Sequence, residues 1–148
     1  MTDRITTARA ALWVNRGIAA LLLLLLPVLP FLLKWYSSLR PLTKGEHLAI
    51  LIAFYCCAVV TAVALWHLDK LLRNILIQQV FILKNVRCIQ VVQYCCALIS
   101  LICLPAAFVY LPLWFMVIIM VFLALVVCVV SQVMKAAVAI REENDLTI

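Results

Sequence analysis

Hydrophobic residues fill four long stretches of the chain, and charged residues lie mainly between them. No Asp, Glu, Lys or Arg occurs in residues 53–65, 88–112 or 113–130. A helix needs about 20 mostly apolar residues to cross the ~30 Å hydrocarbon core of a bilayer. The pattern therefore predicts four transmembrane helices, at about residues 13–33, 48–68, 91–111 and 113–134, followed by a tail over residues 135–148.

The composition excludes a water-soluble domain. The chain is 69% hydrophobic and 12% charged, its mean hydropathy is +1.23, and ordinary globular domains carry about 25% charged residues. No segment outside the four stretches is long enough for a soluble domain, which usually begins near 50 residues. We predict an all-α fold, an integral membrane bundle of four transmembrane helices that forms a single domain over residues 1–148.

The first span resembles a secretory signal peptide at its start, because basic residues precede the leucines of 21–26. However, the apolar run continues to Leu33 and is followed by a lysine and two aromatic residues rather than by small residues. We interpret it as a retained helix.

Pro27 and Pro30 each remove a backbone hydrogen bond, which a membrane tolerates where neighbours satisfy the freed carbonyls. We expect a kink or an early end of this helix.

The basic residues indicate the orientation. With four spans, nine of the 12 Lys and Arg residues lie on the side of the two termini, and the positive-inside rule then places both termini in the cytoplasm. The net charge of +6 indicates the anionic inner leaflet as electrostatic partner. We exclude direct nucleic-acid binding, because no recognition helix or zinc-ligand spacing accompanies the charge.

Seven cysteines suggest metal chemistry, but their spacing does not support it. There is no C-x-x-C, and His47 and His67 lie about 30 Å apart at the two ends of span two. We expect neither a metal nor a cofactor, and interpret the cysteines as packing residues. A thiol reagent should label at most Cys88, which lies at the cytoplasmic edge.

Small residues follow helical spacing in spans two and three, which predicts that these spans pack closely. The two faces consist of Ala53, Cys57, Thr61 and Ala64, and of Cys96, Ser100, Cys103 and Ala107. Leu111 and Pro112 leave room only for a tight turn, so spans three and four should form an antiparallel hairpin.

The segment over residues 69–90 is amphipathic. We predict that helix two runs past the membrane, turns near Gln78 and Gln79, and returns as a short cytoplasmic amphipathic segment through Leu83 and Val86. Such a segment either lies in the membrane interface or offers a surface to a protein partner.

The tail is helix-prone and ends in an acidic cluster. Glu142, Glu143 and Asp145 are half of the six acidic residues of the chain. A charge run is usually a solvated end. Here it is also the natural counterpart of Lys84 and Arg87, although exposed pairs contribute only about 0–1 kcal/mol.

Two motifs resemble a known family. The pattern V-F-x-x-x-N-V-R-x-I covers residues 80–89, and I-R-E-E-N-D-L-T-I closes the chain at residues 140–148. With the four-span layout, they make nearly the whole chain similar to the bacterial membrane family named domain of unknown function 2975. Genes of this family commonly neighbour a helix-turn-helix regulator of the Cro/CI type. The resemblance implies a bacterial plasma membrane and a contact with such a regulator through Phe81, Lys84, Asn85, Arg87, Arg141, Glu142, Glu143, Asn144 and Asp145.

Two functional classes follow. The first is a non-enzymatic regulatory or adaptor protein that contacts a cytoplasmic partner through residues 69–90 and 135–148. The second is a small permease, efflux or immunity component that acts on a lipophilic compound, as a single chain or a homo-oligomer. Ionisable groups inside spans normally mark ion and proton paths, and none lies deep in these spans, which disfavours proton-coupled transport. The chain also lacks a nucleophile with a base, paired carboxylates or a phosphate loop, so we predict no enzymatic activity.

Overall fold

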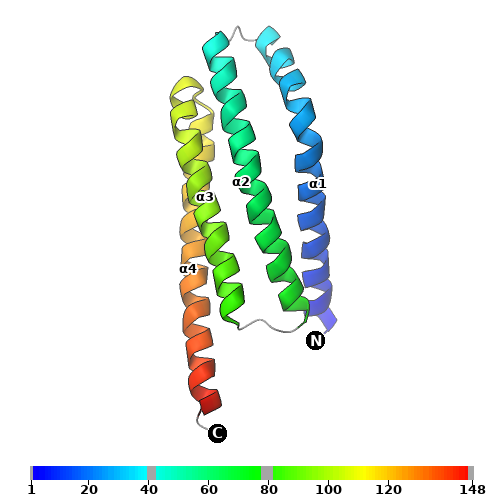
Figure 1. The fold of residues 1–148 in the computed structure, drawn as a ribbon, viewed down its shortest axis with the longest axis vertical. Helices are drawn as coiled ribbons and strands as arrows, with labels where there is room; N and C mark the ends of the chain where they lie inside the picture. Colours follow the sequence, from blue (N-terminus) through cyan, green and yellow to red (C-terminus); the bar gives the residue numbers. More distant parts are fainter. Residues whose placement is uncertain (1, 40–42, 78–81, 147–148) are drawn as a thin grey trace.

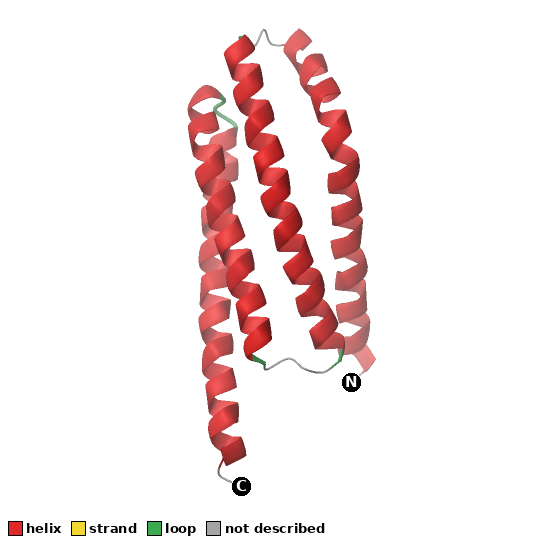
Figure 2. Ribbon diagram, in the orientation of Figure 1, coloured by secondary structure: helices red, strands yellow, loops and turns green. Residues whose placement is uncertain are grey.

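The computed structural model of the chain is all-helical in the part that it describes, residues 2–39, 43–77 and 82–146. Its elements are α1 (Thr2–Leu39), α2 (Lys44–Leu76), α3 (Leu83–Val109) and α4 (Leu113–Leu146). No strand occurs among these residues (Figure 2). Each helix is long and apolar enough to span a membrane. The predicted all-α architecture with four candidate membrane spans is therefore confirmed.

Successive helices run in opposite directions, so the N- and C-terminal ends of the chain lie at the same end of the molecule (Figure 1). We call this the terminal end. Helix α1 packs against α2, α2 against α3, and α3 against α4, and no other helix pair packs closely within the described residues. The helices thus form an open array in chain order, with α1 at one edge and close helix packing of α1 only with α2 among the described residues.

Helix α1 continues through both of its prolines to Leu39, so the alternative of an early end is wrong. A hydrogen bond from α2 supports the helix at Pro30. Proline 30 has no N–H to donate to the carbonyl of Leu26, four residues before it, and the hydroxyl of Tyr55 donates to this carbonyl at 3.2 Å instead. A neighbouring helix therefore satisfies the backbone group that Pro30 leaves free, as backbone inside a bilayer requires.

The predicted hairpin of spans three and four is confirmed. Its turn is closed by backbone hydrogen bonds from the N–H of Leu113 to the carbonyl of Tyr110 and from the N–H of Trp114 to the carbonyl of Leu111, at 3.0 and 3.1 Å. The core beside this turn consists of Ile99, Cys103, Ala107 and Val117, with residues of α2 packed against it.

The small-residue faces of α2 and α3 meet in this core. The Sγ atoms of Cys57 and Cys103 lie 3.5 Å apart, and Ala53, Ser100 and Ala107 are buried. Such a short separation needs small side chains on both helices, because larger ones would hold the backbones apart. The sequence prediction that spans two and three pack along these faces is therefore confirmed at Cys57 and Cys103.

The segment before span three differs from its prediction. Residues 83–90 form the first turns of α3 rather than a separate segment on the membrane surface. Val86, Cys88 and Ile89 are buried, because their apolar side chains pack against neighbouring helices instead of lipid headgroups. The turn predicted at Gln78 and Gln79 lies outside the described residues.

Candidate functional site

The charged residues define a boundary across the terminal end. Counted outward from the apolar centre of each helix, the first charged residues are Arg16 on α1, Asp69 on α2, Arg87 on α3 and Lys135 on α4. The uncharged part of α4 before Lys135 is about 33 Å long at 1.5 Å per residue, which matches a hydrocarbon core of about 30 Å. Side chains beyond this boundary are therefore available to headgroups, water or a partner.

Helix α4 extends beyond this boundary as a projecting helical end. From Lys135 to Leu146 it adds about 18 Å, and Figure 1 shows that its last turns project past the start of α3. Ser131 and Val138 are still buried, on the helix that packs only against α3. Every residue from 139 to 144 is exposed. We call residues 139–146 the α4 overhang.

The residues that were predicted to bind a partner lie on two helices. Lys84 and Arg87 are exposed on the first turns of α3, and Arg141, Glu142, Glu143 and Asn144 are exposed on the α4 overhang. Asp145 lies in the last helical turn of α4. Phe81 lies outside the described residues.

Asn85 has a different place from the other predicted residues. Its side chain is fully buried, and its Oδ1 accepts a hydrogen bond of 2.7 Å from the Nδ2 of Asn74. This bond joins the end of α2 to the start of α3. Asn85 is thus a packing residue between two helices. Its side chain does not belong to an exposed contact surface, although the family resemblance implied that it would.

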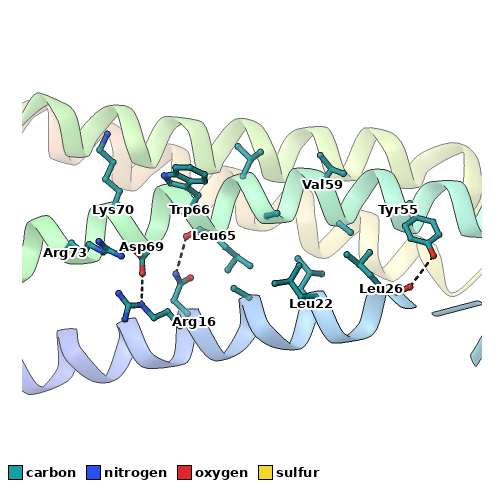
Figure 3. Close-up of a pocket in the computed structure, with 16 residues that line it drawn as sticks. Arg16, Leu22, Leu26, Tyr55, Val59, Leu65, Trp66, Asp69, Lys70 and Arg73 are labelled. Atoms are coloured by element: carbon teal, nitrogen blue, oxygen red, sulfur yellow. Dashed lines mark hydrogen bonds and ion pairs between the residues drawn. The ribbon is translucent and has the colours of Figure 1, made fainter. Parts of the chain in front are cut away.

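An ion-pair cluster that the sequence analysis missed joins α1 to α2 at the boundary. The carboxylate of Asp69 meets the Nε of Arg16 at 3.3 Å and the Nε of Arg73 at 2.7 Å. Figure 3 shows Arg16 and Asp69 facing each other from the two helices. Two signals were present: Arg16 lies within the first predicted span, where an arginine needs a partner, and Asp69 is the only acidic residue between Glu46 and Glu142.

The cluster closes one end of a groove between α1 and α2. The groove has a volume of about 950 Å³, and its wall is mostly apolar between Trp66 and Tyr55 (Figure 3). Asn15 lies at its polar end, only 4% exposed, and its Nδ2 donates to the Leu65 carbonyl at 3.2 Å. Its Oδ1 is buried and accepts no hydrogen bond among the described residues.

A second cavity of about 490 Å³ lies among all four helices and is almost wholly apolar. Leu26, Cys57, Cys103 and Met120 are among the residues that line it. With so few polar groups on its wall, this cavity offers packing space rather than a reactive centre.

The cysteines show no metal-site geometry in the described part of the chain. No group of three or more His, Cys, Asp or Glu residues gathers there, and all seven cysteines are free thiols. Cys88, the thiol expected to be labelled at most, is only 5% exposed. It lies on the side of α3 that packs against other helices.

These features define a multi-pass membrane protein of four helices, with a polar cluster and a projecting helical end on the side of its termini. Comparison with known families assigns it further. The chain belongs to the family described as Protein of unknown function (DUF2975), whose pattern matches residues 7–148. The family assignment made from the two sequence motifs is therefore confirmed. No curated protein and no solved structure matches the chain.

Proposed function

We propose that the protein is a non-enzymatic adaptor in the bacterial plasma membrane that binds a cytoplasmic helix-turn-helix regulator. The α4 overhang is the observation that carries this proposal. A helix that only had to cross the bilayer could end near Lys135, yet α4 continues to Leu146. The overhang offers a helical surface that is exposed over residues 139–144, of the kind that proteins use for recognition in a groove or on a flat partner surface.

The surface of the overhang combines apolar and charged contacts. Ile140 is 60% exposed although it lies beyond the hydrocarbon boundary, where water makes an exposed isoleucine unfavourable. Arg141 and Glu142 follow it on the exposed helix. Partner interfaces typically combine an apolar anchor with a polar rim, and burial of Ile140 by a partner would remove the cost of its exposure.

The cytoplasmic placement of this surface is part of the proposal. Nine of the 12 basic residues belong to the terminal end of the molecule, which supports a cytoplasmic orientation of that end by the positive-inside rule. The family's frequent gene neighbour, a Cro/CI-type regulator, supplies a candidate partner on the same side of the membrane.

A triple charge reversal tests the proposal. We expect Glu142→Lys, Glu143→Lys and Asp145→Lys together to leave membrane insertion and abundance unchanged, because the three residues lie beyond the hydrocarbon core. Co-purification of the neighbouring regulator and the transcriptional response should both be lost. The matched control is the charge-conserving triple change Glu142→Asp, Glu143→Asp and Asp145→Glu, which should retain both.

A compensating reversal distinguishes two forms of the contact. If the acidic residues pair internally with α3, then Lys84→Glu and Arg87→Glu should restore both readouts in the triple variant. If they contact the regulator, the readouts should stay lost. A triple variant that behaves like the parent protein in both assays would show that the overhang is an inert end and would refute the adaptor proposal.

The groove between α1 and α2 favours a second candidate function, a permease, efflux or immunity component for a lipophilic compound. Its volume of about 950 Å³ lies at the upper end of the range of ligand sites. Ala62→Trp would fill the groove from α2. Loss of transport or resistance in this variant, with regulator binding retained, would favour the second candidate over the adaptor.

A further inference from the structure

We propose that the groove between α1 and α2 binds one glycerophospholipid from the leaflet at the terminal end, with an anionic headgroup held beside Arg16 and Arg73. This inference does not depend on the adaptor proposal, because it uses different residues and a different ligand. Three features of the groove support it: its length, its charge and its position at an open edge of the helix array.

The apolar part of the groove has the length of one leaflet. On α2 its lining runs from Tyr55 to Trp66, and on α1 from Ala19 to Leu26. At 1.5 Å per residue the α2 part is about 16 Å long, and one half of a hydrocarbon core of about 30 Å is about 15 Å. An acyl chain that starts at the boundary would therefore reach Tyr55 without entering the opposite leaflet.

The polar end of the groove carries more positive than negative charge. Arg16, Asp69, Lys70 and Arg73 all line this end, so three cations stand against one carboxylate, which pairs with the two arginines. In both arginines the Nε meets Asp69, and a guanidinium carries five N–H donors in all. The two arginine side chains are 50% and 59% exposed, and each can offer its terminal N–H groups to a phosphate, which arginine binds in a bidentate manner.

Lys70 contributes to the same field from α2. Its side chain extends away from α1 in Figure 3, so it flanks the headgroup site rather than closing it. Trp66, which lines the groove at this level, is 75% exposed and suits the headgroup region, where tryptophan is enriched. Charge and aromatic placement thus match a phosphate at the membrane interface.

The position of the groove gives a lipid direct access. Helix α1 packs only against α2 within the described residues, so no further helix closes the outer side of the groove. A phospholipid is already present at high concentration at this edge.

The test uses the purified full chain, reconstituted with equal amounts of phosphatidylglycerol and phosphatidylethanolamine of the same acyl chains. Native mass spectrometry then measures which lipid remains bound after release from mild detergent. We expect one retained lipid for each chain, with phosphatidylglycerol preferred at least fivefold, since each juxtamembrane cation contributes about 1 kcal/mol toward anionic lipid.

Three variants locate the site. Lys70→Gln with Arg73→Gln should lower phosphatidylglycerol retention at least fivefold, and it keeps the Arg16 to Asp69 pair that joins the helices. Asp69→Asn should raise retention, because it removes the negative charge that lines this end, while the amide oxygen of asparagine can still accept from the Nε–H of Arg16 and keep α1 in place. Ala62→Trp should abolish retention of either lipid. The matched control is Lys84→Gln with Arg87→Gln, which removes two exposed cations from α3 at the same end and should retain phosphatidylglycerol like the parent.

Four results would overturn the proposal. Equal retention of the two lipids would show a non-selective lipid shell. An equal loss in the α3 control would show general attraction to the charge of the terminal end. A fall in retention with Asp69→Asn would show that the cluster acts only as a clamp between helices. A dimer in the parent that Ala62→Trp converts to a monomer would show that a second copy of the chain fills the groove.

Discussion

The hydrogen bond from Tyr55 to Leu26 gives the sharpest test of how α1 is held. The Leu26 carbonyl has no backbone donor because residue 30 is proline, and the Tyr55 hydroxyl at 3.2 Å takes the place of that donor. Tyr55→Phe removes only this hydroxyl. Hydrogen bonds between membrane helices contribute about 0.6 kcal/mol on average and up to about 1.7, while a buried polar group left without a partner costs about 1–3 kcal/mol. We expect Tyr55→Phe to lower the free energy of unfolding by about 1 kcal/mol.

Pro30→Ala makes the test specific. Alanine restores an N–H that can donate to Leu26, so in this background the tyrosine hydroxyl becomes redundant and Tyr55→Phe should cost little. A double-mutant cycle should thus give a coupling energy of about 1 kcal/mol between positions 55 and 30. Pro27→Ala is the matched control, because its restored N–H would reach the carbonyl of Leu23 instead.

The measurement is reversible unfolding in mixed micelles by titration with a denaturing detergent, followed by circular dichroism at fixed protein concentration. Tyr94→Phe serves as a second control, since Tyr94 is 66% exposed and its hydroxyl has no interhelical role in the described structure. An equal cost of Tyr55→Phe in the parent and in the Pro30→Ala background would refute the claim that the tyrosine replaces the missing backbone donor.

Three further predictions follow from the topology and the packing. Reporter proteins fused after residue 148 or within residues 76–84 should read cytoplasmic and one at Lys44 external; a periplasmic C-terminus would refute the orientation. Membrane-impermeant maleimide should leave the buried Cys88 unlabelled but label an exposed control, Lys84→Cys, from the same side; strong labelling of Cys88 would contradict its packed position. Cys57→Leu should destabilise the protein by about 1–3 kcal/mol, because the larger side chain overpacks against Cys103, whereas Cys57→Ala should destabilise it by much less. Equal stability of the two variants in the same unfolding assay would show that the small-residue faces of α2 and α3 do not pack closely.

The sequence predicted the elements of the fold well because the bilayer restricts the choices. Uninterrupted apolar runs of about 20 residues leave few alternatives to spanning helices, and the two residues available for the last loop required a hairpin. The small-residue faces on α2 and α3 were also readable, since close helix packing in lipid depends on such residues. These features are local in the sequence or repeat with helical spacing.

The parts that could not be predicted depend on contacts between distant residues. Nothing in the order of the residues indicated that the Tyr55 hydroxyl would donate to the Leu26 carbonyl. Nor did it indicate that the Asn74 side chain would donate to the Asn85 side chain at 2.7 Å. The amphipathic pattern of residues 83–90 fits a membrane surface and a helix–helix interface equally well. Only the position of α3 against its neighbours decides between the two, and it buries Val86.

The candidate site illustrates the same limit. Lys84, Arg87 and the acidic tail were identifiable by charge alone, because exposed charges need no partner to be recognised in a sequence. The contact between α1 and α2 in the Asp69 cluster was missed because Asp69 follows Arg16 by 53 positions in the chain. An arginine inside a predicted span was nevertheless a signal for an acidic partner, and Asp69 was the nearest candidate at the same depth.

The attachment of α1 connects these observations. Few of its described side chains are buried, and in lipid two apolar helix faces gain little from each other, because the acyl chains are equally apolar. Polar contacts therefore decide where α1 lies: Arg16 with Asp69 at the terminal end, Leu26 with Tyr55 in the middle, and Tyr36 with Tyr110 at 2.9 Å toward the other end. The groove lies between the first two contacts, so its walls keep their spacing only while both persist. Loss of either contact should consequently loosen α1 beside the groove while the packed core of α2, α3 and α4 remains intact.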